Sequence, residues 1–380
     1  MHNKKLRSIA VRVAYHLQQK LGKLHHQPLR TLVMMVSAFI VAGGPWLSEM
    51  GRKLADLPGT LHDKVNRMSR FLAHSEFSVA EVFGILGQRI VEGFARAYPK
   101  HSILIAMDWT DLGAYMGLWL SLPYQGRGLP LSCAVLAKSA AENAMTDTEA
   151  ELLRGFLMLF PAEIRSRIVI LADRGFAKRE LFDVIEECGA SWAIRLPRNR
   201  QIRQGDSWVE LRDLRLAPGE TRLLGEVECV KEAPKKIRLA IRRLRPEDVD
   251  PKDDDDTWYV GTNLVELDNV LGWYAKRFSI EEMFRDLKSA LNMDRHHLHT
   301  EDGVGKMMLI VALAYLVLFE DGNQWRSKVE LSRIQKPSAW GALSVFRVAM
   351  ICFDQCLAEA PEEPAAALLA RWTNRSSVRV

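Results

Sequence analysis

The stretches Arg-Ile-Val-Ile-Leu-Ala-Asp at Arg167–Asp173 and Ser-Ile-Leu-Ile-Ala-Met-Asp at Ser102–Asp108 decide the fold of this 380-residue chain. Each is a short apolar run that ends in an aspartate, and such a run predicts a buried strand. A carboxylate at the end of a buried strand costs free energy unless it has a partner or a function. Two such aspartates on neighbouring strands can share a divalent cation, because hard cations prefer carboxylate oxygens.

The segments around these two runs predict a mixed sheet with helices on its faces. The further elements are strands at 114–122, 129–136 and 191–196 and helices at 146–160 and 178–188. Pro-Tyr-Gln-Gly-Arg-Gly at 123–128 is typical of a hairpin turn. Thr146-x-x-Glu149 resembles a capping box at the start of the first helix. The order of three strands, helix, strand, helix, strand indicates an α/β fold.

Residues 197–262 predict a small β-rich insertion. Short alternating runs occur at 208–211, 221–230 and 237–244, and a strand is predicted at 258–262. Residues 195–245 contain 14 basic and 7 acidic side chains, so the insertion is positively charged. Four aspartates at 253–256 predict a polar loop, because consecutive side chains cannot all converge on one ion.

The first 100 residues are predicted to be helical and basic, with 15 Lys or Arg against 6 Asp or Glu. Ser48 can cap a helix at 49–57, and Thr60 can cap the next one, at 61–72. The second helix carries a basic stripe of Lys64, Arg67 and Arg70. Two short helices, the second with a basic stripe, suit a reader of duplex DNA. A solvated basic face on a helical bundle explains the stripe equally well.

Composition places the chain among soluble globular proteins. Net charge is +5 and the isoelectric point is about 8.9, so nucleic acid is a plausible partner. The five cysteines are scattered and are expected to be buried thiols, Cys352 and Cys356 included. The N-terminus has no signal-peptide pattern. The apolar runs at 32–41 and 307–319 are shorter than a membrane span of roughly 18–20 residues. We therefore expect two buried helices and a cytoplasmic protein without membrane contact.

A helix starting near Ile280, capped by Ser279, carries a third acidic residue. Its predicted core stripe is Ile280, Met283, Phe284, Leu287 and Leu291. Glu281 and Lys288 line one flank of that stripe, where Glu281 can lean into a site at the sheet edge. Glu282 and Asp286 are predicted to point to solvent. Taken in isolation, this is an ordinary amphipathic helix.

Four residues of this region carry a resemblance. Tyr274, Arg277, Glu281 and Lys288 have the spacing Tyr-x2-Arg-x3-Glu-x6-Lys, which resembles the signature of a large group of bacterial insertion-sequence transposases. Asp108, in Asp-Trp-Thr, and Asp173, in Ala-Asp-Arg-Gly, are similar to the first two acids of that family's Asp-Asp-Glu triad. The intervals are 64 and 107 residues, and the second contains the β-rich insertion. Leu-Ser-Glu-Met at 47–50 and Ser-Arg-Phe-Leu at 69–72 are also similar to the family's N-terminal part, so that the resemblance covers roughly residues 30–320.

The resemblance implies a ribonuclease-H-like catalytic core that cuts and joins DNA. Its catalytic residues and metal ligands would be Asp108, Asp173 and Glu281. They would hold two Mg²⁺ ions, for which Mn²⁺ can substitute. Tyr274, Arg277 and Lys288 would contact phosphate near the end of the element.

Three further residues have two interpretations each. Two interpretations fit Arg174 equally well: a contact with DNA and a structural ion pair with a carboxylate. Related enzymes use a hairpin intermediate, for which an aromatic residue holds a displaced base. Trp208 and Trp258 are candidates, although burial in the core explains either one better.

The sequence therefore predicts a transposase that excises and joins its element by cut-and-paste. The alternative is a silent or domesticated copy that only binds DNA. Expected partners are double-stranded DNA with terminal inverted repeats, a target DNA, and a second copy of the chain in a homodimer on DNA. The predicted parts are a DNA-binding region (1–100), the first part of the core (101–196), the insertion (197–262), the remainder of the core (263–325) and a helical C-terminal region (326–380).

Overall fold

The computed structural model describes residues 26–54, 59–74, 78–229, 234–249 and 255–326, together with residues 346 and 350. The predictions for the N-terminal segment, for Cys352 and Cys356 and for most of region 326–380 lie outside the described residues. Within them, Cys133, Cys188 and Cys229 are buried and form no disulfide, as predicted for core thiols.

The described strands form one mixed sheet of ten, in the order β3-β2-β1-β4-β5-β10-β9-β8-β6-β7. β1 pairs with β4, and β4 with β5, in parallel, whereas the other neighbours are antiparallel. The strands are β1 Ile103–Leu112, β2 Tyr115–Tyr124, β3 Arg127–Ala137, β4 Ile168–Ala172, β5 Ser191–Arg195, β6 Gln201–Gln204, β7 Ser207–Glu210, β8 Thr221–Cys229, β9 Lys235–Arg243 and β10 Thr257–Thr262.

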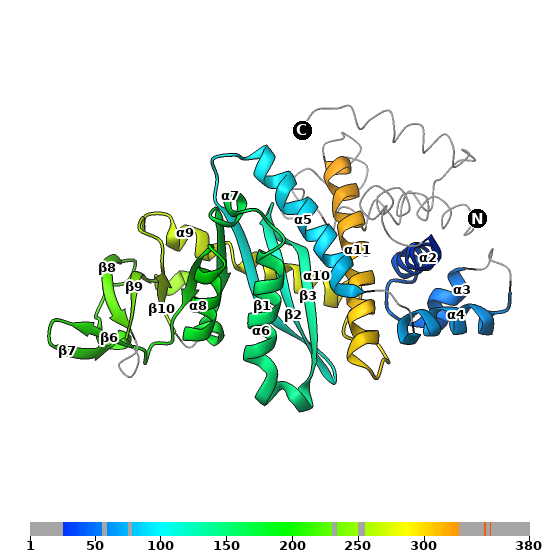
Figure 1. Ribbon diagram of the computed structural model, residues 1–380, viewed down its shortest axis with the longest axis horizontal. Helices are drawn as coiled ribbons and strands as arrows, with labels where there is room; N and C mark the ends of the chain where they lie inside the picture. Colours follow the sequence, from blue (N-terminus) through cyan, green and yellow to red (C-terminus); the bar gives the residue numbers. More distant parts are fainter. Residues whose placement is uncertain are drawn as a thin grey trace.

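Helices pack on both faces of the sheet and beyond its β3 edge (Figure 1). The α-helices are α2 His26–Ala42, α3 Leu47–Lys53, α4 Leu61–His74, α5 Val79–Ala97, α6 Ala141–Leu157, α7 Ala162–Arg165, α8 Arg179–Glu187, α9 Val270–Ala275, α10 Phe278–Ser289 and α11 Glu301–Arg326. Short 3-10 helices occur at η1 Lys138–Ala140, η2 Arg174–Phe176, η3 Leu211–Asp213 and η4 Pro246–Asp248.

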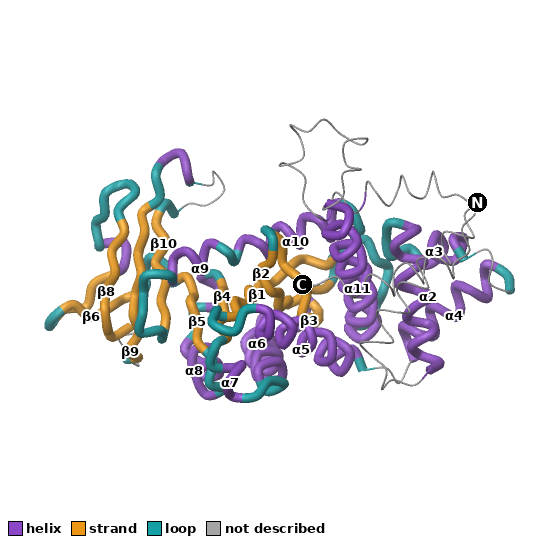
Figure 2. Tube along the Cα trace, turned by 90° about the horizontal axis from the view of Figure 1, so that it is seen from above, coloured by secondary structure: helices purple, strands orange, loops and turns teal. Residues whose placement is uncertain are grey.

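The two faces of β1 and β4 bury different sets of helices, and Figure 2 shows the sheet between them. Ile103 and Ile105 pack in one core with α6 and α8. Leu104 packs in another core with Tyr274 of α9, and Ala106 packs with α10. Because successive side chains of a strand point to opposite faces, even-numbered residues of β1 face α9 and α10. This places Asp108 on the α10 face and Trp109 on the α6 face.

Asp108 does not end its strand as predicted. β1 continues to Leu112, because antiparallel pairing with β2 extends through Asp108 and Trp119 to the end of the strand. The parallel pairing of β1 with β4 ends at Ala106 and Leu171, and β4 itself ends at Ala172, as predicted. Continuing that register by two residues on each strand puts Asp108 level with Asp173.

The hairpin between β2 and β3 confirms the predicted turn. The turn residues are Gln125 and Gly126, with φ of 50° and 76°. Two successive residues at positive φ are what a tight two-residue hairpin requires, which explains the glycine. Both strands are longer than predicted because their pairing runs to the turn itself, from Tyr115 and Ala137 to Tyr124 and Arg127.

Three predicted helix starts are wrong. α3 begins at Leu47 and ends at Lys53, with Trp46 rather than Ser48 as its N-cap residue. α6 begins at Ala141, so Thr146 lies inside the helix and forms no capping box. α10 begins at Phe278, immediately after α9, and Ser279 is buried without capping it. The three helices start two, five and two residues earlier than predicted, respectively.

The predicted cap of α4 is confirmed. Thr60 Oγ1 accepts from the Asp63 backbone N–H at 3.2 Å, and Asp63 Oδ2 accepts from the Thr60 N–H at 2.8 Å. These reciprocal bonds satisfy two backbone donors at the helix start, as a capping box does. The helix continues to His74, two residues beyond the prediction.

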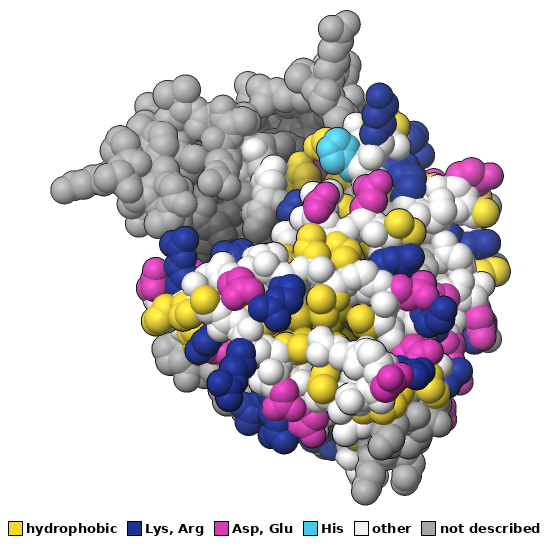
Figure 3. Space-filling model, turned by 90° about the vertical axis from the view of Figure 1, so that its left-hand side faces the viewer, with side chains coloured by type: hydrophobic (Ala, Val, Ile, Leu, Met, Phe, Trp, Pro, Cys, Tyr) yellow, Lys and Arg dark blue, Asp and Glu magenta, His cyan; other side chains and the backbone are white. Residues whose placement is uncertain are grey.

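The β-rich segment continues the central sheet, since β10 pairs with β5 and β9 pairs with β10. Figure 3 views this end of the molecule, where basic and acidic side chains are interspersed. Ion pairs account for part of the pattern: Arg203 Nη1 lies 3.0 Å from Glu228 Oε2, and Lys236 Nζ lies 2.8 Å from Glu226 Oε1. The positive charge of this segment is therefore partly balanced locally.

The two apolar runs form helices. α11 is longer than its predicted apolar run, and its segment Glu301–Glu320 is long and apolar enough to cross a membrane. The bent pair formed by Thr31–Ala42 and Leu47–Lys53 passes the same test if it is taken as one span. The α11 segment is 89% buried inside the protein, which is typical of a core helix.

Candidate active site

The two aspartates are held by backbone contacts at the point where β1 and β4 diverge. Asp108 Oδ1 accepts from the Trp109 backbone N–H at 2.9 Å. Asp173 is the N-cap residue of η2, and its Oδ1 accepts from the Gly175 N–H at 2.8 Å. A short polar side chain at an N-cap satisfies a helix donor, so the turn after β4 fixes this carboxylate.

Arg277 joins the strand acid to the helix acid. Its Nη1 lies 3.3 Å from Asp108 Oδ2, and its Nη2 lies 2.6 Å from Glu281 Oε1. The guanidinium carbon is 4.7 Å from the centroid of the Phe278 ring and 5.8 Å from that of Tyr274. Only 7% of the Arg277 side chain is exposed, whereas Glu281 is 44% exposed. The prediction that Glu281 leans toward the sheet is thus supported by a direct link to Asp108.

The electrostatics place Asp173 in the same group. Burial raises the pKa of Asp108 to about 7; Arg277 opposes this rise, and Asp173 and Glu281 add to it. Burial lowers the pKa of Arg277, but Tyr274 and the three carboxylates outweigh burial and leave it above its ordinary value. With all three carboxylates ionised, the group has one positive and three negative charges. The net charge of the group is therefore −2, and two positive charges would neutralise it.

An all-carboxylate donor set with a deficit of two charges fits a hard divalent cation. In the described residues, no group of three or more His, Cys, Asp or Glu side chains is already arranged to hold a metal ion. Arg277 bonds to both Asp108 and Glu281 and so supplies the positive charge between them. The assignment of these acids as metal ligands stays a prediction.

The tyrosine of the signature is fully buried beneath this group. Tyr274 packs edge-to-face against Trp258, with ring centroids 5.2 Å apart, and Trp258 stacks on Phe278 at 5.9 Å. Burial raises the pKa of the Tyr274 hydroxyl. A buried ring cannot touch DNA phosphate as the chain stands, so its position indicates a support for Arg277. Trp208 lies on β7, at the far edge of the sheet.

The remaining predicted DNA contacts lie on two separate surfaces. Arg174 is exposed directly after Asp173, and Lys288 is half-buried on α10. Lys64, Arg67 and Arg70 lie on α4, where Arg67 Nη2 donates to Thr31 Oγ1 of α2 at 3.3 Å. The contact of these residues with DNA stays a prediction.

Glu282 and Asp286 do not point to solvent as predicted. Arg127, at the start of β3, lies 3.2 Å from Glu282 Oε2 through its Nη1 and 2.8 Å from Asp286 Oδ2 through its Nε. Burial raises the pKa of Asp286, and Arg127 opposes the rise. The prediction fails because the β2–β3 hairpin covers this flank of α10, which helical periodicity cannot show. The predicted core stripe is confirmed, since all five of its residues are buried.

Sequence reasoning missed a buried carboxylate on the opposite face of the sheet. Glu149 is 1% exposed and bonds to Trp109 and Lys178. The only signal was Thr146-x-x-Glu149, which we interpreted as a capping box. One helical turn separates the two residues, so the same spacing also lets both reach one partner.

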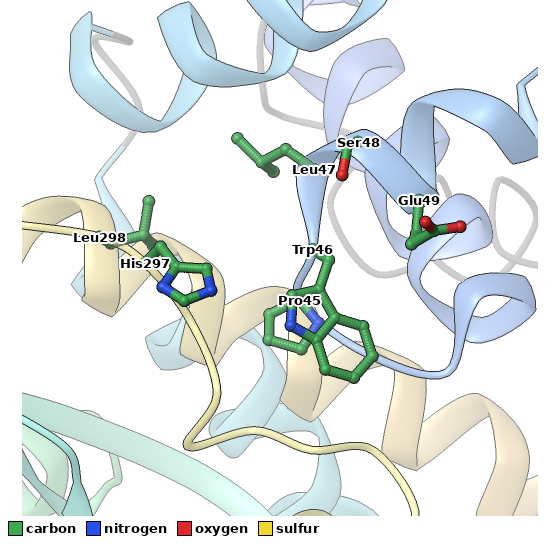
Figure 4. Close-up of a pocket in the computed structure, with 7 residues that line it drawn as sticks. All are labelled: Pro45, Trp46, Leu47, Ser48, Glu49, His297 and Leu298. Carbon is green, nitrogen blue, oxygen red and sulfur yellow. The ribbon is translucent and has the colours of Figure 1, made fainter.

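A pocket of about 490 Å³ has none of the three acids in its lining, which Figure 4 shows. Residues 45–49, between α2 and α3 and at the start of α3, line one side, and His297 and Leu298 line the other. His297 lies between His296 and His299, and these three histidines form no metal site among the described residues. Burial lowers the pKa of His296, which packs near Tyr115.

Comparison with known proteins assigns the family. A comparison with curated proteins gave no match. The family model described as "Transposase DDE domain" matches residues 100–317, a stretch that runs from just before β1 into α11 and contains Asp108, Asp173 and Glu281. The match covers more than half of the chain, and it agrees with a mixed α/β architecture and with the enzyme class of transposases. The chain belongs to the DDE transposase domain family.

Proposed function

We propose that this protein is an active transposase that excises its own element and joins it to a target DNA by cut-and-paste. The observation that carries the proposal is the arrangement of the acids. Asp108 lies on β1, Asp173 directly follows the neighbouring strand β4, and Arg277 ties Asp108 to Glu281 of the helix packed on the same face. The strand order β3-β2-β1-β4-β5, with β1, β4 and β5 parallel, supports a ribonuclease-H-like core.

Asp108, Asp173 and Glu281 are the residues that would hold Mg²⁺ or Mn²⁺, in a site for two ions. When bound, such ions activate a water or a 3′-hydroxyl and stabilise the leaving oxygen at phosphorus. The chain supplies the position of these ligands. β1 carries Asp108, the turn directly after β4 carries Asp173, and burial of the apolar stripe of α10 positions Glu281.

Arg277 has two roles in this scheme. In the free chain its guanidinium balances the charge of Asp108 and Glu281. A DNA phosphate, like a carboxylate, offers two oxygens that accept parallel N–H bonds from a guanidinium. It can therefore take over Arg277 and leave both acids to the cation. Tyr274 and Phe278 pack against Arg277 and keep it at the rim of the site. Lys288 and Arg174 would extend the phosphate contact on either side.

The basic residues of α4 would contact the terminal inverted repeats, with a homodimer pairing two ends. Trp258 is better placed than Trp208 to hold a displaced base in a hairpin intermediate. It stacks on Phe278, which is 37% exposed and lies against Arg277. Aromatic faces bind bases by stacking whatever their sequence.

A silent or domesticated copy that only binds DNA is the second candidate. One observation favours it: in the described residues the acids are not gathered as a metal site, and Arg277 already neutralises two of them. A copy of this kind would bind its ends without cutting them.

Strand cleavage separates the two functions. The substrate is DNA carrying the gene's own flanking ends, incubated with Mg²⁺ or Mn²⁺ and either the wild type or Asp173→Ala. We expect metal-dependent 3′-hydroxyl ends with the wild type and none with the variant, while both bind the DNA. A target plasmid added later tests joining. If both proteins bind and neither cuts, the DNA-binding function stands in place of the proposal.

A further inference from the structure

The segments that carry the two aspartates are joined on the side of the sheet away from α10. Trp109 follows Asp108 directly and points to the α6 face, where its Nε1 donates to Glu149 Oε1 at 2.9 Å. Lys178 lies five residues after Asp173, and its Nζ donates to Glu149 Oε2 at 2.9 Å. The Glu149 carboxylate thus binds both segments that bear the aspartates. Its Oε1 binds Trp109, and its Oε2 binds Lys178.

The junction of Trp109, Glu149 and Lys178 is centred on a buried carboxylate, and both oxygens of that carboxylate accept a hydrogen bond. The Glu149 side chain is 1% exposed, and Lys178 is 31% exposed. Lys178 Nζ also donates to Thr146 Oγ1 at 3.0 Å, one turn before Glu149 on α6. Charge-assisted bonds in a low-dielectric interior are stronger than exposed ones, and a buried carboxylate without its partners is costly. Each partner therefore restrains the position of the segment that bears it.

The chain between each acid and its anchor is short and rigid. Trp109 donates through its backbone N–H to Asp108 Oδ1, so the residue that Glu149 holds also fixes the Asp108 carboxylate. Between Asp173 and Lys178, η2 supplies a backbone bond from the Phe176 N–H to the Asp173 carbonyl, and Lys178 N donates to the Phe176 carbonyl. The parallel pairing of β1 and β4 has ended by this point, so no ladder bond sets the separation of the aspartates.

We propose that Glu149 is a positioning residue that fixes the spacing of Asp108 and Asp173 for cation binding. The inference rests on the proposed function, because it assumes that these aspartates bind a divalent cation. Glu149 itself touches neither substrate nor cation. Its bonds to Trp109 and Lys178 replace the missing ladder bonds between β1 and β4. Outer residues of this kind commonly change metal affinity or activity by about 10- to 100-fold when they are replaced.

The test measures Mn²⁺ affinity by calorimetry and cleavage as a function of Mn²⁺ concentration, in the full chain with its end DNA. In Glu149→Gln the amide cannot accept from both donors as the carboxylate does. We expect Mn²⁺ affinity to fall about 10- to 100-fold. Cleavage should recover at saturating Mn²⁺, and DNA affinity should be unchanged. Lys178→Met should reproduce the effect, and the double variant should add little, because both changes break one junction.

Two variants guard against a general loss of stability. Glu187→Gln breaks an exposed ion pair between α6 and α8, the helix that begins directly after Lys178. In this pair Arg154 Nη2 lies 3.1 Å from Glu187 Oε2, and the variant should leave Mn²⁺ affinity unchanged. Trp109→Phe removes one donor and keeps an aromatic ring, so it should show the metal effect even if Glu149→Gln fails to fold.

The outcomes separate the two proposals. Wild-type affinity for Mn²⁺ in Trp109→Phe and in any folded Glu149→Gln protein would overturn the role of Glu149 and leave the proposed function intact. The role of Glu149 is equally overturned if Glu187→Gln weakens Mn²⁺ binding to the same extent. A wild type that neither binds Mn²⁺ nor cuts would overturn the proposed function and, with it, this inference.

Discussion

Two arginine-centred clusters flank the same helix, and they differ in charge balance. On one flank of α10, Arg277 bonds to Asp108 and Glu281, with Asp173 close enough to act on both Asp108 and Arg277. On the other flank, Arg127 bonds to Glu282 and Asp286. Each arginine ties α10 to β1 or β3 through two carboxylates, so geometry alone does not tell the clusters apart.

The difference lies in the uncompensated charge. The Arg127 cluster includes Arg285, whose Nη1 lies 2.5 Å from Glu282 Oε1, so two arginines face two carboxylates. In the Arg277 cluster, one arginine faces three carboxylates. A balanced cluster is a structural tie, whereas an excess of negative charge of this size is what the proposed cation site requires. The comparison teaches that adjacent acids on one helix, Glu281 and Glu282, can have unrelated roles.

The largest expected effect comes from these two neighbours. Glu281→Gln should reduce cleavage by on the order of 10²- to 10³-fold or more, the scale for losing one group that stabilises developing charge. Glu282→Gln is the matched control and should retain cleavage within a few-fold. Initial rates of strand nicking at fixed Mg²⁺ provide the measurement. Equal losses in the two variants would break the distinction between the clusters.

Replacing the two arginines should separate cation binding from stability. Arg277→Gln removes the resident positive charge, so the DNA-free protein should bind Mn²⁺ more tightly than the wild type does, several-fold by calorimetry. Its cleavage should nonetheless fall, because the phosphate contact is lost. Arg127→Gln should leave Mn²⁺ affinity unchanged. Weaker Mn²⁺ binding by Arg277→Gln would show that this guanidinium does not compete with the cation.

The Arg127 cluster should matter for folding. Arg127→Ala leaves Asp286, which is 14% exposed, without its partner. Breaking a fully buried ion pair costs roughly 3–5 kcal/mol, and partial exposure of both groups reduces this to about 2 kcal/mol. Urea unfolding followed by circular dichroism measures the change. If the free energy of unfolding falls by less than about 0.5 kcal/mol, this cluster contributes no more to stability than an exposed surface ion pair does.

The smallest effect is a pH dependence. Burial raises the pKa of Asp286, so the folded chain keeps this proton at pH values where the unfolded chain has lost it. This carboxyl therefore lowers the free energy of unfolding as the pH rises from about 4 through its folded pKa, and the effect is constant above that. Asp286→Asn should remove this decline. The test compares the free energies of unfolding of variant and wild type at several pH values. If both change with pH in the same way, Asp286 is not the source of the decline.

Local sequence patterns predicted many of the strands and helices of the fold. Apolar runs gave β1 and β4, the turn residues gave the β2–β3 hairpin, and period 3.6 gave the buried stripe of α10. Errors occurred wherever a distant segment decided the outcome. Asp108 lies inside its strand because β2 extends it, and Asp286 is half-buried because the hairpin covers it. The start of α6 was misplaced because Thr146 and Glu149 bond Lys178 instead of capping the helix.

The sequence by itself predicted three acids, two at buried strands and one on an amphipathic helix, in a spacing that resembles a DDE transposase, and the chain belongs to that family. Such information is local, because burial and helical phase depend on neighbouring residues. Only the tertiary structure decided which acids meet. Arg277 joins Asp108 and Glu281 across 169 and 4 residues of chain, and Glu149 ties Trp109 to Lys178. These contacts depend on strand register and on helix packing against the sheet, which no single segment encodes.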